Sequence, residues 1–134
     1  MANLNDCVSI ADYRDRARRA LPRILFDYID GGSYAEETLR ANEAAFRAVS
    51  LTQRVMIDVS HVESKVTLFG QTLGMPVICA PVGFAGMYAR RGEVQAGRAA
   101  KAAGIPFCLS TVAICSIEEV TAGAGIPPWF QLYM

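Results

Sequence analysis

The polar residues best suited to chemistry lie at the ends of two apolar runs in the C-terminal half of the chain. Ser110 and Thr111 close one run, and Gln131 and Tyr133 lie in the last one. Alternate side chains of a strand point the same way, so Gln131 and Tyr133 would face one ligand together. Hydroxyl and carboxamide groups both donate and accept hydrogen bonds. The pattern therefore predicts a polar binding rim.

No complete catalytic set follows from residue spacing. His61 is the only histidine of the sequence, and it lies in a predicted connection between elements. Ser110 and Thr111 could supply a nucleophile, but no partner base can be identified for them. The sequence has no H-E-x-x-H motif and no cysteine–histidine spacing typical of a metal site. We therefore predict a binding rim, and no metal.

The cysteines and the N-terminus indicate a cytoplasmic protein. Four isolated cysteines form no C-x-x-C pair, which is typical of small buried thiols in a reducing compartment. They are Cys7, Cys79, Cys108 and Cys115. The N-terminus lacks the basic and apolar regions of a secretory signal. Residues 66–89 are uncharged, but their glycines and prolines would break a membrane-spanning helix several times.

Length and charge restrict the class of protein further. The chain has 134 residues, the size of one ordinary domain. Its 13 acidic and 13 basic residues give a formal net charge of zero. No basic stripe interleaved with aromatic residues is present, so nucleic acid is not expected as a partner.

Three apolar runs position the predicted rim. Residues 76–81, 106–111 and 128–134 predict buried parallel strands, and the Ala-rich segment 92–104 predicts a helix that Gly104 ends. A second helix is expected between the last two strands. The polar or small residues at the strand ends, and the lack of a G-x-G-x-x-G fingerprint, favour a barrel over a doubly wound sheet. The predicted fold class is α/β, the N-terminal part of a (β/α)8 TIM barrel with about three barrel strands.

A helical lead-in and a small β-hairpin precede these strands. Ser9 is the predicted N-cap of a first helix, and Pro22 the first turn of a second helix that ends before Gly31. A third helix is predicted over 35–49, with four inward residues: Leu39, Ala44, Phe46 and Val49. The predicted layout has three parts. The helical lead-in covers residues 1–50, an extended connection (51–65) and the hairpin together cover 51–75, and the first β/α units cover 76–134. The hairpin is predicted over 66–73, around a turn at Gly70 and Gln71.

Five segments in register carry a resemblance to a known family. They are Phe26–Gly32, Met75–Gly83, Gly86–Glu93, Leu109–Thr111 and Trp129–Tyr133. Together they resemble the FMN-dependent 2-hydroxy acid dehydrogenase/oxidase family, and the third is most similar to bacterial respiratory L-lactate dehydrogenases. The resemblance covers the chain from about Ser9 onward. It implies FMN as cofactor and a small L-2-hydroxy acid as substrate, with L-lactate the leading choice.

The resemblance also implies roles for individual residues. Tyr28 and Tyr133 match tyrosines that face the substrate. A second group matches residues that contact the flavin: Pro81, Val82, Gly83, Ser110 and Gln131. Small residues suit the loop of the first strand, because a bulky side chain would prevent close backbone approach. Gly83 and the motif similarity favour a dehydrogenase over an oxygen-using oxidase.

The sequence also departs from the family. The Ser-Asn-His-Gly-Gly-like stretch that carries the family's general base is missing, and His61 lies outside any matching motif. We therefore expect residues 1–134 to be the N-terminal portion of a single domain, inactive alone, within an intact homo-oligomeric enzyme whose electron acceptor is unknown. Peripheral attachment to the inner face of the cell membrane stays open. Two alternatives remain: a truncated non-catalytic remnant, and another flavin- or phosphate-binding barrel such as a type 2 isopentenyl diphosphate isomerase or an IMP dehydrogenase relative.

Overall fold

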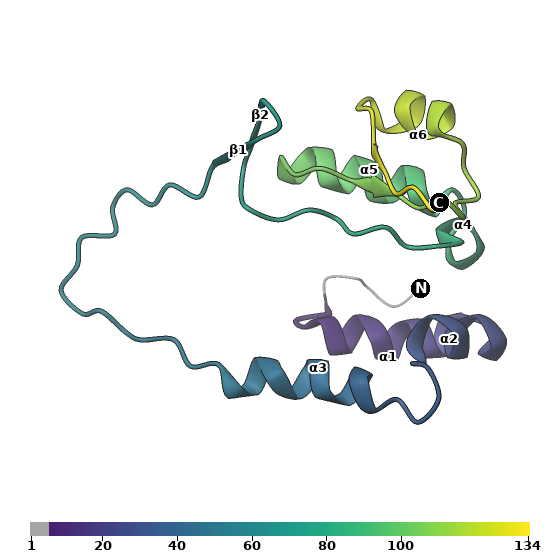
Figure 1. Ribbon diagram of the computed structural model, residues 1–134, viewed down its shortest axis with the longest axis horizontal. Coiled ribbons are helices and arrows are strands. Elements are labelled where there is room, and N and C mark those ends of the chain that lie inside the picture. The colour runs from purple at the N-terminus through teal and green to yellow at the C-terminus, as the bar shows by residue number, and fades with distance from the viewer. Residues whose placement is uncertain (1–5) are drawn as a thin grey trace. The chain divides into compact units, whose positions relative to one another are not determined.

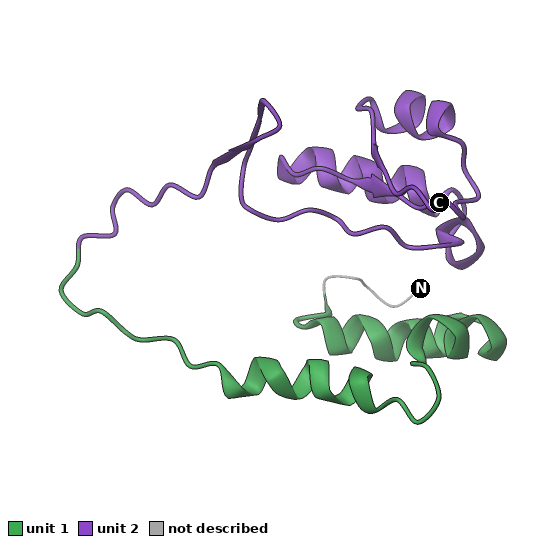
Figure 2. Ribbon diagram, viewed as in Figure 1, with its two compact units in different colours: residues 1–57 green, residues 58–134 purple. Residues whose placement is uncertain are grey.

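The computed structural model describes residues 6–134, so the first five residues of the predicted lead-in lie outside the described residues (Figure 1). The chain divides into two compact units, residues 1–57 and 58–134 (Figure 2). The first unit is helical, and the second holds the hairpin and the β/α elements. The boundary falls within the extended connection 51–65, which has no helix or strand, as predicted.

Helix α1 (Ile10–Ala20) begins at a capping box, and this confirms Ser9 as its N-cap. The Asp12 N–H donates to Ser9 Oγ over 3.3 Å, and the Ser9 N–H donates to Asp12 Oδ2 over 2.7 Å. The Ser9 side chain and backbone donors lower the pKa of Asp12. The start of α1 is therefore fixed by local sequence, since both partners lie within one turn.

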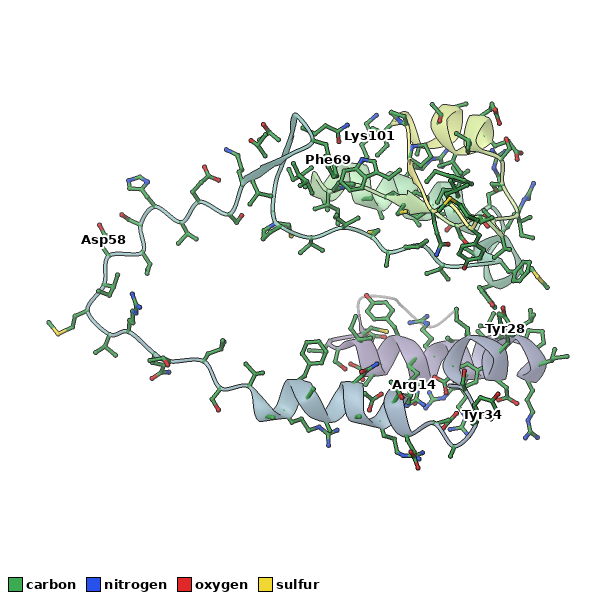
Figure 3. All side chains as sticks on the ribbon, in the orientation of Figure 1. Arg14, Tyr28, Tyr34, Asp58, Phe69 and Lys101 are labelled. Carbon is green, nitrogen blue, oxygen red and sulfur yellow. The ribbon has the colours of Figure 1, made fainter. Side chains whose placement is uncertain are left out.

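Helix α2 (Arg23–Asp30) begins one residue later than predicted, because Pro22 is its N-cap and not part of its first turn. It ends at Gly31, as predicted. An ion pair joins it to α1: Arg14 Nε lies 2.5 Å from Asp30 Oδ1, and Arg14 Nη2 donates to Asp30 Oδ2 over 2.9 Å (Figure 3). The two-pronged geometry makes this contact between the two helices directional.

Helix α3 (Glu37–Ala48) confirms the third predicted helix, slightly shortened at both ends. The inward face predicted for it is wrong. Phe46 is 85% exposed, Ala44 and Val49 are also exposed, and only Leu39 is half-buried. The apolar spacing was sufficient for a helix, but no layer of the described residues covers this side.

The hairpin of strands β1 (Val66–Leu68) and β2 (Gln71–Leu73) is confirmed as an antiparallel pair. The turn predicted at Gly70 and Gln71 is wrong, because Gln71 is already paired in the ladder. The turn residues are Phe69 and Gly70, with φ angles of 50° and 76°. Both lie in the left-handed region that a tight two-residue hairpin turn requires.

Three neighbouring segments form a short parallel sheet. Strand β3 (Cys108–Leu109) is central, strand β4 (Trp129–Phe130) pairs with it on one side, and Cys79 bridges to Phe107 on the other. The Cys108 N–H donates to the Cys79 carbonyl over 3.0 Å, and the Trp129 N–H to the Phe107 carbonyl over 2.9 Å. The three predicted strands occur in the predicted order along the chain but are shorter than predicted, because ladder pairs form over only part of each run.

Three helices accompany these strands (Figure 1). Helix α5 (Gly92–Ala103) confirms the predicted helix, and Gly104 caps it at φ 67°. Helix α6 (Ile117–Ala124), between β3 and β4, confirms the expected second helix. The short α4 (Ala85–Tyr88) was not predicted. Within residues 6–134, no helix is long and apolar enough to cross a membrane.

The core of the second unit lies between the sheet and helices α5 and α6. It consists of Val94, Ala100, Phe107, Leu109, Cys115, Val120 and Ala124. The two helices approach closely through glycines: a Cβ at Gly97 would lie 2.9 Å from Ala124 Cβ, and one at Gly123 would lie 2.6 Å from Val94 Cγ1. At the hairpin, the Phe69 ring packs edge-on against Trp129 at 5.5 Å. Helices α5 and α6 thus pack against the sheet, and the hairpin contacts strand β4 through the Phe69 and Trp129 rings.

Candidate functional site

The predicted rim residues follow three adjacent parallel segments. Gly83 follows Cys79, Ser110 follows β3 directly, and Gln131 follows β4 directly. Carboxyl ends of neighbouring parallel strands meet at one edge of a sheet, which is where ligands bind in α/β folds. The Gln131 N–H donates to the Leu109 carbonyl over 2.9 Å, which keeps the end of β4 against the end of β3.

Ser110 and Gln131 are brought into direct contact. The Ser110 hydroxyl, 4% exposed, donates to Gln131 Oε1 over 3.2 Å and accepts the Val112 N–H over 3.3 Å. The neighbouring Thr111 hydroxyl donates to the Gln131 backbone carbonyl. With Oε1 engaged, the Gln131 Nε2 group makes no hydrogen bond within residues 6–134. The amide therefore offers two donors to a ligand.

The loop after Cys79 lies against the loop after β3. A Cβ at Gly83 would lie 2.8 Å from Val112 Cγ2, and the Phe84 N–H donates to the Val112 carbonyl over 3.0 Å. Pro81 is half-buried and Val82 exposed. Gly83 is required by close approach and not by its φ angle, so the first loop can lie flat beside the second.

Glu93 is a buried acid that the sequence analysis did not identify. It is 1% exposed, in the first turn of α5, and its Oε1 accepts the N–H groups of Gly86 and Ile114, each over 2.9 Å. Oε2 has no hydrogen-bond partner among the described residues. The signal that could have found it is helical spacing, because Glu93, Gly97 and Ala100 share one face of α5.

Electrostatics around Glu93 favour its charged form. Burial on its own would raise the pKa of Glu93, but the backbone N–H groups of Ile114, of Glu93 itself and of Gly86, together with the Cys115 thiol, bring it below its ordinary value. Burial and the nearby carboxylate raise the pKa of the Cys115 thiol. An ionised carboxylate beside a neutral thiol therefore lies beneath the two loops at neutral pH.

The two predicted substrate tyrosines are both accessible. Tyr133 is 61% exposed and follows Gln131 beyond the end of β4. Tyr28 is 66% exposed on α2, in the first unit (Figure 3). The strand predicted over 128–134 ends at Phe130, so the common direction of Gln131 and Tyr133 stays a prediction, as do the ligand roles of all the rim residues. His61 is exposed in the connection before the hairpin.

Comparisons with known proteins cover almost the whole chain. The family model described as FMN-dependent dehydrogenase matches residues 17–134. L-lactate dehydrogenases of Caulobacter sp. (strain K31) and Pseudomonas syringae pv. syringae (strain B728a) are 60% and 59% identical over 126 residues, which is 94% of this chain and 33% of each relative. This chain therefore spans about one third of the length of those relatives.

Solved structures show the same fold over this region. A mandelate oxidase superposes with a TM-score of 0.88 at 38% identity, covering 95% of this chain and 37% of that one. A soluble mutant of the membrane-associated (S)-mandelate dehydrogenase from Pseudomonas putida superposes with a TM-score of 0.88 at 34% identity, covering 98% and 37%.

Proposed function

Because the chain belongs to the FMN-dependent dehydrogenase family, we propose that the whole protein oxidises a small L-2-hydroxy acid, foremost L-lactate, to the 2-keto acid. Relatives named L-lactate dehydrogenase, 59% and 60% identical, support L-lactate over the mandelate named in structures at 34% and 38% identity. They also favour this reaction over those of an isopentenyl diphosphate isomerase or an IMP dehydrogenase.

The residues at the rim fit the cofactor of this family. When bound, FMN supplies the acceptor for the hydride that leaves the substrate α-carbon while the hydroxyl proton passes to a base. The contact of Ser110 with Gln131 is the observation that carries the proposal, since it leaves Nε2 as a donor that would meet the polar side of a flavin ring. At Gly83, where a Cβ would lie 2.8 Å from Val112 Cγ2, the missing side chain lets the first loop pack closely beside the loop that carries Ser110.

Substrate binding falls to the two tyrosines. By the resemblance, the Tyr28 hydroxyl would donate a hydrogen bond to the substrate carboxylate, and Tyr133 would be a second tyrosine that faces the substrate. Both side chains are accessible. We assign the general base to a residue outside residues 1–134, because the Ser-Asn-His-Gly-Gly-like stretch is missing from them and His61 lies outside any matching motif.

We further propose that residues 1–134 form the N-terminal portion of a single (β/α)8 domain. Within residues 6–134 the sheet has room for further strands beside both Cys79 and β4. A closed barrel of this kind takes about 250 residues. The whole protein would be a cytoplasmic homo-oligomer that passes electrons to a second acceptor, and residues 1–134 alone would be inactive.

The test uses the longest product of the gene that contains this chain, purified from source cells. Its intact mass, the FMN released on denaturation and L-lactate oxidation with an artificial electron-accepting dye would be measured together. We expect a mass two to three times that of this chain, one FMN per subunit, and oxidation of L-lactate faster than that of glycolate or mandelate. A product of 134 residues without FMN would instead indicate a non-catalytic remnant.

A further inference from the structure

The carboxylate of Glu93 ties together the first and second rim loops. Its Oε1 accepts the Gly86 N–H and the Ile114 N–H, each over 2.9 Å. Gly86 belongs to the loop and short helix after Cys79, and Ile114 to the loop after β3. One oxygen therefore fixes two backbone segments that come from successive β/α units.

The first of these loops contains the predicted flavin contacts. Pro81, Val82 and Gly83 lead directly into Phe84, whose N–H donates to the Val112 carbonyl over 3.0 Å. A second tie, through Glu93, lies two residues further at Gly86. Two anchors on one side leave the backbone of this loop little freedom to move away from the second loop.

The burial of Glu93 is costly. The other buried residues of α5 are Val94, Gly97 and Ala100, which carry no charge. A carboxylate that is 1% exposed, with Oε2 unpartnered among the described residues, pays a desolvation penalty that a small apolar residue would avoid. What the acid supplies in return is the pair of bonds to the two loops.

We propose that Glu93 is a positioning residue for the flavin, acting through the backbone of the loop Pro81–Gly83. The carboxylate holds this loop against the second loop through its bonds to Gly86 and Ile114. The inference rests on the proposed function, because it requires FMN at the rim. Glu93 would thus support the flavin site from beneath the rim without touching the ligand itself.

The test compares three variants of the longest gene product. Glu93→Ala removes both bonds, whereas Glu93→Gln keeps a carbonyl oxygen in the same place. Glu119→Ala is the matched control, because Glu119 also lies in the first turn of a helix and accepts one backbone N–H, from Ser116 at 3.0 Å, but joins no loops. Titration with FMN, the visible spectrum of bound FMN, and hydrogen exchange of the peptide that contains Gly86 would be measured for each.

We expect E93A to weaken FMN binding about tenfold or more, to shift the bound-flavin spectrum toward that of free FMN, and to speed exchange at Gly86. E93Q should stay within about threefold of the parent protein, and E119A should bind FMN as the parent does. Unchanged affinity in E93A, or equal losses in E93A and E119A, would overturn the proposal.

A further variant keeps the test informative if E93A does not fold. If E93A does not fold, Glu93→Asp is used, because its shorter side chain cannot reach both N–H groups. If neither variant folds, Glu93 is a determinant of the fold and not of flavin position, and the proposal fails. If the parent protein itself binds no FMN, the proposed function fails first, so the two failures are distinguishable.

Discussion

The two units of the chain differ in what holds them together. The described part of the first unit, residues 6–57, has three helices, a two-pronged ion pair between Arg14 and Asp30, and exposed apolar side chains such as Ile24 and Phe46. The unit from residue 58 has a contiguous core around Leu109. The difference shows that a segment can have the sequence signals of a helix without supplying the apolar residues of a buried core. The first unit is specified locally and the second by its packing.

The largest contrast is expected from apolar truncation. Leu109→Ala should lower the free energy of unfolding of the second unit by about 3 kcal/mol, since Leu109 is fully buried in its core. Ile24→Ala, on exposed α2, should cost less than about 0.5 kcal/mol. Urea unfolding followed by circular dichroism would measure both. Equal losses would show that the first unit has a core of its own and would break the comparison.

The next largest effects concern ligand binding in the whole protein, where we expect the second unit to bind FMN and the first unit to bind the substrate. Gln131→Ala, in the second unit, should weaken FMN binding about tenfold through loss of the Nε2 donor. Tyr28→Phe, in the first unit, should raise KM for L-lactate about tenfold and leave FMN affinity unchanged. Tyr34→Phe, an exposed tyrosine between α2 and α3, is the matched control and should change neither.

Steady-state kinetics and FMN titration separate these effects. A loss of FMN affinity in Y28F would place the first unit at the cofactor. A Q131A protein that binds FMN normally would remove Gln131 from the cofactor site.

The two capping boxes offer a smaller and closely matched comparison. Ser116 caps α6 with Glu119, and Ser9 caps α1 with Asp12, in the same geometry. Ser116→Ala should cost the cooperative second unit about 1 kcal/mol, whereas Ser9→Ala should cost about 0.5 kcal/mol and only fray α1. Thermal unfolding gives the first value and helix content at low temperature the second. A cooperative shift with S9A would contradict local specification.

The smallest effect expected is a pH dependence of helix content in the first unit. The hydrogen bond from Arg14 holds the pKa of Asp30 below its ordinary value. Because the pKa of Asp30 is lower in the folded state, its ionised form stabilises the folded helices at any pH above the unfolded pKa, near 3.8. This stabilisation is lost as the pH falls through the folded-state pKa. Helix content should therefore decline slightly below about pH 4, and the decline should be smaller in 1 M salt and in Asp30→Asn, in which the capping carboxyl of Asp12 still titrates. A loss near neutral pH would require another group.

Elements with local signals could be predicted from the sequence. The N-cap at Ser9 was found because its partner lies three residues away, and the end of α5 because Gly104 adopts a left-handed conformation. The hairpin turn was misplaced by one residue because Phe69 adopts a positive φ, which its residue type does not signal. Local chemistry therefore fixed the ends of helices better than the turn.

Features that depend on distant partners could not be read with the same accuracy. The length of a strand depends on how far its neighbour runs beside it, so runs such as 76–81 reduce to one bridging residue, Cys79. Glu93 was missed because an acid in the first turn of a helix ordinarily faces solvent and the helix dipole. Only the fold brings Gly86 and Ile114 to its carboxylate.

The edge-on contact between Phe69 and Trp129 has an optical consequence. Trp129 is the only indole of the 134-residue chain, and it lies in the second unit. Intrinsic fluorescence excited at the indole band therefore reports on one unit only, whereas far-ultraviolet dichroism sums the helices of both. Recording the two signals on one sample during unfolding separates the units without any label, because a transition seen by dichroism but silent in emission arises in the helices before residue 58.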